Sequence, residues 1–158
     1  MNKLLRTLLI SMSVLMLLQH QYAHAQTLRQ KLADATRLEC RFSALATTSW
    51  DKDTGAGTAT VTPSELESSF FDINIAEGTA EADSRFGASF IIARYTSGYM
   101  HLMQLSDAGP LYITTVMAAE STNGRLLAVH VRHEYSPAII PGFTSRPEMY
   151  VGDCAITG

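Results

Sequence analysis

From residue 38 onwards, apolar and polar positions alternate in short runs that are separated by turn residues. In the first run, Leu38, Cys40 and Phe42 fall on one side of an extended chain, while Glu39 and Arg41 fall on the other. This period of two predicts a strand with one buried face. Similar runs predict further strands at 70–76, 79–84, 88–95, 99–106, 111–119 and 125–135. Strands at such regular spacing, joined by short turns, predict a mainly β domain built as an antiparallel meander.

Local signals refine this meander at three places. Asn123-Gly124 stands between two strand-like runs, and both residues tolerate the positive φ of a two-residue type I′ hairpin turn. The segment 27–35 begins with a capping box and places its apolar residues on one face, which predicts a short N-terminal helix before Cys40. Thr62-Pro63-Ser64-Glu65 also carries the signals of a helix start and predicts one helical turn.

The first 25 residues have the three parts of a secretory signal peptide. Lys3 and Arg6 make the start basic, Leu8 to Leu18 form an apolar run, and Ala23-His24-Ala25 has small residues at the positions that define cleavage. The apolar run is too short for a membrane anchor, which needs about twenty residues. We therefore predict a signal peptide at 1–25, no membrane span after its removal, and a single secreted β-rich domain at 26–158, in the periplasm or outside the cell.

The charge of the domain argues against one class of partner. The whole chain has a formal net charge of -3, and removal of Lys3 and Arg6 leaves the rest more acidic. The remaining basic residues are scattered singly from Arg29 to Arg146. Binding to nucleic acid depends on clustered Lys and Arg side chains. Nucleic acid is therefore not an expected partner.

Two cysteines, Cys40 and Cys154, lie near the two ends of the predicted domain. In an exported chain such a pair predicts a disulfide that ties the first core strand to the last. The alternative is a reactive or intermolecular thiol pair, although the Cys-x-x-Cys spacing of redox motifs is absent. A disulfide between the ends of a meander favours a sheet that closes into a small barrel, with a sandwich as the alternative.

The stretch His130-Val131-Arg132-His133-Glu134 has the densest group of reactive side chains. On a strand, His130, Arg132 and Glu134 share one face, and His133 lies on the other. The order His-x-x-His-Glu matches neither motif of the helical zinc proteases. We take His130, Arg132, His133 and Glu134 as a candidate functional face, with His101 as a partner from another strand.

A structural role for the same residues is the favoured alternative. His130, Arg132 and Glu134 can form a polar ladder across neighbouring strands, with Tyr112 as one possible partner, and His133 can be an ordinary core or rim histidine. The sequence contains neither a Gly-x-Ser-x-Gly nucleophile motif nor a glycine-rich phosphate loop. We therefore predict no cofactor and no metal site, and we assign no catalytic residue.

Two further features suggest binding rather than catalysis. An apolar cavity for a small ligand is one hypothesis, with ordinary core packing as the alternative; its lining would be Phe90, Ile92, Tyr99, Met100, Met103, Tyr112 and Met117. The segment 137–147 carries three prolines and several apolar residues. Loops of this length often cover a binding site or contact a protein partner.

Several of these segments together resemble a family of small secreted bacterial β-rich domains of uncharacterised function. The resemblance rests on Thr114-Thr115-Val116, on Ala128-Val129-His130-x-Arg132-His133-Glu134, on Pro147, and on Tyr150-x-Gly152-x-Cys154. It spans most of the chain from Cys40 to Cys154. It implies a bacterial, periplasmic setting in which the two cysteines form a framework pair, and it implies no activity.

Three functions remain open from the sequence. The favoured one is an exported binding or interaction module whose partner is a protein or a small apolar ligand. The second is a hydrolase or metal-dependent enzyme that uses His130, His133 and Glu134 with His101, which requires these side chains to converge around a cleft. The third is a structural protein of the cell envelope with a filled core and an exposed apolar patch.

Overall fold

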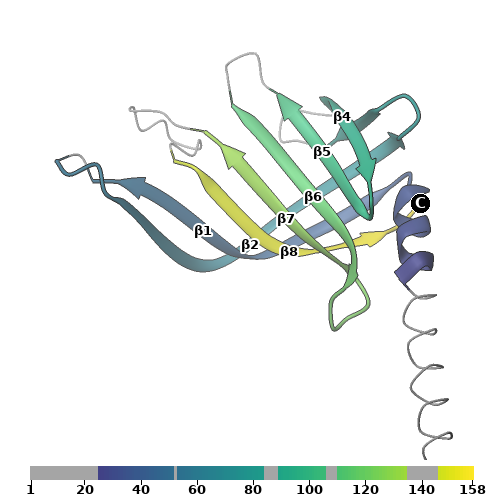
Figure 1. The fold of residues 1–158 in the computed structure, drawn as a ribbon, viewed down its shortest axis with the longest axis horizontal. Helices are drawn as coiled ribbons and strands as arrows, with labels where there is room; N and C mark the ends of the chain where they lie inside the picture. The colour runs from purple at the N-terminus through teal and green to yellow at the C-terminus, as the bar shows by residue number, and fades with distance from the viewer. Residues whose placement is uncertain (1–24, 52, 84–88, 106–109, 135–145) are drawn as a thin grey trace, which may run out of the picture.

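The protein folds into a closed antiparallel barrel, shown in Figure 1. The computed structural model describes residues 25–51, 53–83, 89–105, 110–134 and 146–158. Its strands are β1 (Leu38–Trp50), β2 (Gly57–Asn74), β3 (Thr79–Ala82), β4 (Ser89–Thr96), β5 (Tyr99–Leu105), β6 (Leu111–Glu120), β7 (Leu126–His133) and β8 (Glu148–Ile156). Each strand pairs with the next, and β8 pairs with β1. The predicted meander and its closure into a barrel are therefore confirmed.

A helix at residues 25–33 packs at one end of this barrel, next to the end of β8 (Figure 1). Leu28, Leu32 and the following Ala35 are buried in the core, as the periodicity predicted. The Tyr95 hydroxyl of β4 donates a 2.8 Å hydrogen bond to the Arg29 carbonyl oxygen and so fastens the helix to the barrel. Thr27 lies within the helix rather than at its start, so the capping-box assignment was wrong while the helix itself is confirmed.

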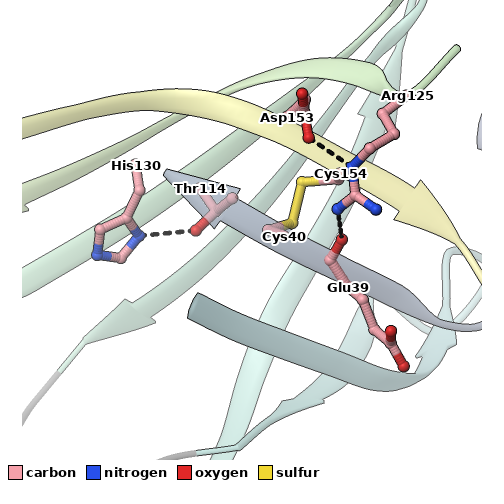
Figure 2. The surroundings of a disulfide bond; sticks show 7 residues. All are labelled: Glu39, Cys40, Thr114, Arg125, His130, Asp153 and Cys154. Carbon is pink, nitrogen blue, oxygen red and sulfur yellow. Dashed lines mark hydrogen bonds and ion pairs between the residues drawn. A yellow bond between two sulfur atoms is a disulfide. The ribbon is translucent and has the colours of Figure 1, made fainter. Parts of the chain in front are cut away.

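The pairing of β1 with β8, which we call the seam, closes the barrel. Cys40 lies directly opposite Cys154, and the two form a disulfide, as predicted. Figure 2 shows Arg125 beside this disulfide. The Arg125 side chain donates hydrogen bonds to the carboxylate of Asp153 on β8 and to the carbonyl oxygen of Glu39 on β1. These contacts hold the first and last strands together through covalent and charge-assisted bonds.

Gly152 allows the seam strands to approach closely. It lies opposite Phe42, and a Cβ atom at this position would collide with the carbonyl oxygen of Arg41 and the Cα of Phe42. Both obstacles are backbone atoms, which a rotamer change cannot move. Only glycine therefore fits at this point of the seam.

Two local predictions were wrong in detail. Thr62 to Glu65 is part of the continuous strand β2 and forms no helical turn. Phe42 of β1 pairs with Leu66 of β2, but Ala44 of β1 pairs with Pro63, so β2 has one more residue than β1 between these two pairs. A bulge of this kind tolerates proline within a sheet.

The 121–125 turn between β6 and β7 lies where it was predicted, but Gly124 alone has a positive φ there. Hydrogen bonds from Gly124 N to Ser121 O and from Ser121 N to Arg125 O identify a three-residue hairpin loop instead of type I′.

The barrel interior changes in character along its axis. Residues that face inward and lie opposite one another form three layers across β5, β6, β7, β8 and β1. The first of these layers, on the side of the helix, is Met100, Val116, Ala128, Gly152 and Phe42. The middle layer is Leu102, Thr114, His130, Tyr150 and Leu45. The third, which we call the polar layer, is Gln104, Tyr112, Arg132, Glu148 and Thr47. The core is thus apolar beside the helix and polar at the opposite end.

Candidate functional site

The candidate site lies in the middle and polar layers of the interior, where β6, β7 and β8 run side by side. Six side chains interact there and are called the Arg132 cluster: Tyr112, Thr114, His130, Arg132, Glu148 and Tyr150. Alternation along each strand points all six to the inside of the barrel. Thr114, His130, Glu148 and Tyr150 are each buried.

Arg132 lies at the centre of the cluster. Its Nε donates to Nε2 of His130 at 3.3 Å, and its Nη1 lies 3.7 Å from Oε2 of Glu148. The guanidinium carbon is 5.1 Å from the ring centroid of Tyr150 and 5.9 Å from that of Tyr112. These are distances at which an aromatic ring attracts a cation. The positive charge is therefore held by one carboxylate and two phenol rings.

His130 is neutral and its tautomer is fixed by its neighbours. Since arginine can only donate, Nε2 of His130 must be the acceptor, and the ring proton must be on Nδ1. Nδ1 then donates to the Thr114 hydroxyl oxygen at 2.8 Å, a contact visible in Figure 2. Burial, and secondarily the charge of Arg132, lower the pKa of His130 from 6.5 to about 4. Both ring nitrogens are thus engaged in hydrogen bonds.

The two tyrosines act as hydrogen-bond donors to carboxylates. Tyr150 donates to Oε2 of Glu148 at 2.5 Å, and Tyr112 donates to Oε2 of Glu134 at 3.1 Å. Burial, and next the bond to Glu148, raise the pKa of Tyr150 to about 12. Burial and the nearby charge of Glu134 raise the pKa of Tyr112 above its usual value of 10. Both phenols therefore keep their protons at neutral pH.

The candidate residues from the sequence divide between the two sides of the barrel wall. His130 and Arg132 are in contact inside, and Glu134 reaches the same region through Tyr112. His133 is exposed and pairs with Leu111 on the outer side. His101 also faces outward, where its Nδ1 bonds to the Thr115 hydroxyl at 3.0 Å. The structure does not bring His133 and His101 to the cluster.

The described part of the chain contains no group of three His, Cys, Asp or Glu side chains that could hold a metal ion. The set proposed for an apolar cavity is also divided. Met100 is buried inside, whereas Phe90, Ile92 and Tyr99 are exposed on the outer side. These residues do not line one cavity, so that interpretation was wrong.

Sequence reasoning missed three members of the cluster: Thr114, Glu148 and Tyr150. Thr114 and Tyr150 lie opposite His130 on β6 and β8, and Glu148 lies opposite Arg132 on β8. The register between strands decides which residues face each other, and a single sequence carries no direct signal for it. Period-two alternation within β8 was the one available hint, because it places Glu148 and Tyr150 on the same face as Cys154.

Comparisons of the chain with protein-family models, with curated proteins and with solved structures gave no match. The resemblance to small secreted bacterial domains therefore stays a prediction. No helix among the described residues is long and apolar enough to cross a membrane. Residues 1–24 of the predicted signal peptide and residues 137–145 of the segment 137–147 lie outside the described residues.

The depressed pKa of His130 predicts a loss of stability in mild acid. The unfolded chain takes up a proton at this residue below pH 6.5, whereas the folded protein does so only near pH 4. Unfolding therefore becomes easier as the pH falls through this window, by about 2 to 3 kcal/mol between pH 7 and pH 4.5. Urea denaturation of His130→Gln should show a pH dependence weaker by this amount. His101→Gln is the control, and an unchanged slope in His130→Gln would contradict the assignment.

Proposed function

We propose that this protein is an exported binding module that takes a small polar ligand into the polar end of its barrel. The observation that carries the proposal is the Arg132 cluster, a connected group of charged and hydrogen-bonding side chains inside a small barrel. Small eight-stranded barrels have an interior that is either filled by side chains or holds one small ligand. Export is supported by the disulfide between Cys40 and Cys154.

Stability alone does not account for a cluster of this kind. Removing a charge from water is costly, and apolar residues of similar size often stabilise a protein as well as a buried ion pair does. The layer nearest the helix shows that this barrel can be filled with Met100, Val116 and Phe42, which are each buried. Polar residues in only one half of the interior therefore point to recognition of a molecule that enters from that end.

The chemistry of the cluster favours a ligand with hydrogen-bond acceptors. Arg132 has five N–H donors, of which those on Nε and Nη1 face His130 and Glu148, and the tyrosine rings offer flat surfaces for an aromatic group. Glu148 and Glu134 already accept bonds from Tyr150 and Tyr112. This lining fits a small polar molecule better than the small apolar ligand that the sequence suggested.

A matched series of benzoate, benzamide and benzylamine tests the proposal. These compounds share a ring and differ in charge, and the first two carry an acceptor. We expect benzoate or benzamide to shift the amide NMR signals of Thr114 and His130 in a saturable way, and benzylamine to leave them unchanged. Arg132→Gln should weaken this binding at least tenfold, while His133→Gln on the outer side should not affect it.

The result that would refute this function is equally specific. If neither benzoate nor benzamide perturbs the interior signals at millimolar concentration, the polar end does not accept such ligands. Equal binding by the wild type and Arg132→Gln would show that the compounds bind elsewhere. Either outcome would favour a structural role for the Arg132 cluster.

A further inference from the structure

The hairpin loop between β6 and β7 carries the one Asn-Gly pair of the chain. Asn123 and Gly124 are both exposed at the tip of this loop. Asparagine loses its side-chain amide most easily when glycine follows it, because a residue without a Cβ atom leaves its backbone nitrogen open to the side-chain carbon. A Cβ atom placed on Gly124 would meet nothing within 4 Å, so the tip is open to water.

Hydrogen bonds hold the Asn123 side chain folded over the Gly124 peptide. Its Oδ1 accepts from the backbone N of Arg125 at 3.1 Å. This bond closes a ring that contains the Gly124 peptide group, as in an Asx-turn, and so brings the side-chain carbon Cγ back toward the Gly124 nitrogen. The Ser121 hydroxyl also donates to Oδ1. Two donors on one carbonyl oxygen stabilise the negative charge that develops there when a nucleophile attacks Cγ.

We propose that Asn123 is a site of spontaneous deamidation, with water as the co-reactant. The Gly124 nitrogen loses its proton to hydroxide and attacks Cγ, which forms the N–Cγ bond of a five-membered succinimide. The Cγ–Nδ2 bond breaks, and Nδ2 leaves as ammonia after taking a proton from water. Water then opens the ring at either carbonyl carbon, which leaves aspartate or isoaspartate.

One hydrogen bond opposes the first step. The Gly124 N–H donates to the Ser121 carbonyl oxygen at 3.1 Å. A backbone bond at an exposed loop tip opens at a small cost in free energy, far below that of global unfolding. The loop therefore slows the attack only slightly.

Loss of the amide changes the contacts of the seam, which Figure 2 shows around Arg125. The Asn123 Nδ2 donates to Oδ2 of Asp153 at 3.2 Å, and Oδ1 of Asp153 accepts from Arg125. Arg125 in turn donates to the carbonyl oxygen of Glu39 on β1. Deamidation puts a negatively charged acceptor where the donor stood, so two carboxylates repel each other and compete for Arg125. It therefore weakens the ties between β1 and β8, and this inference is independent of the proposed ligand site.

Peptide mapping by mass spectrometry tests the modification on the folded protein held at pH 8 and 37 °C. We expect the peptide with Asn123 to gain one mass unit at least tenfold faster than the peptide with Asn74. Asn74 is the internal control, because its Oδ1 also accepts a backbone N–H, from Glu77 at 3.1 Å, but the β-branched Ile75 follows it. Asn123→Gln should abolish the mass gain, because the longer side chain closes its ring far more slowly.

Two results would overturn the modification site. One is an equal rate of mass gain at Asn123 and Asn74. The other is a rate at Asn123 in the folded protein that is more than tenfold below its rate in 8 M urea, because the hairpin would then protect the amide.

The effect on the seam is measured with Asn123→Asp, which carries the product carboxylate from the start. Its urea midpoint should lie below that of the wild type, and the difference should shrink when NaCl is raised from 50 to 500 mM, because salt screens the repulsion. In an Asp153→Asn background the same substitution should change the midpoint little. A midpoint equal to that of the wild type at low salt would refute the coupling between Asn123 and the seam.

Discussion

Replacing Cys40 and Cys154 together with alanine should lower the free energy of unfolding by about 4 to 5 kcal/mol. The two residues are 114 positions apart, so the disulfide closes a long loop and restricts the unfolded chain strongly. It also lies in the seam, where it joins the first strand to the last. Urea denaturation of the oxidised wild type and the double variant measures the difference.

The wild type in reducing buffer is the control for this experiment. Reduction removes the bond but keeps both sulfur atoms, whereas alanine also leaves a small void, since both cysteines are fully enclosed in the core. We expect the reduced wild type to lose most of the same stability. A reduced protein with an unchanged urea midpoint would show that seam contacts such as Arg125 with Asp153 hold the barrel closed without the disulfide.

Arg132→Met should destabilise the protein by about 3 kcal/mol, because it leaves the carboxylate of Glu148 buried without its cation. The Glu148 side chain is 7% exposed, so water cannot replace the lost partner. The double variant Arg132→Met/Glu148→Gln removes both charges and should recover most of this loss. Urea denaturation of the two single variants and the double variant gives the coupling free energy between the residues.

Arg41→Met is the matched control, because the ion pair of Arg41 with Glu67 is exposed, with side-chain exposures of 74% and 71%. Exposed pairs contribute about 0–1 kcal/mol. If Arg132→Met lowers the free energy of unfolding by no more than Arg41→Met does, the charge of Arg132 is solvated and the description of the cluster as buried is incorrect. If the double variant matches the wild type in stability but has lost benzoate or benzamide binding, the cluster serves recognition rather than folding.

The alternation of apolar and polar residues was sufficient to predict most of the strands. The predicted segment 99–106 became β5 (Tyr99–Leu105), and 111–119 became β6 (Leu111–Glu120). Closure and the disulfide followed from the positions of Cys40 and Cys154 near the two ends of the domain. These features depend on local periodicity and covalent chemistry, which a single sequence displays directly.

Features that depend on strand pairing were not predicted. Thr62 to Glu65 has good local signals for a helix, yet pairing with β1 makes it part of a strand, because tertiary contacts outweigh a local preference. The chain pairs Tyr150 with His130 and Glu148 with Arg132 through a register that no local pattern specifies. The catalytic set that includes His133 does not assemble for a different reason, which the sequence already indicated: His133 and Arg132 are neighbours on β7, so their side chains face opposite sides of the barrel wall.

The seam also determines when the barrel can form. One edge of β1 stays unpaired until β8 is available, because its partners lie at the far end of the domain. A chain that emerges with its N-terminus first therefore cannot close the ring while β8 is still inside the ribosome or a translocation pore. Pairings this distant in sequence also fold slowly, in the range of milliseconds to seconds. Late closure of this kind suits a protein that passes through a membrane as an unfolded chain, which is the route that the proposed signal peptide implies.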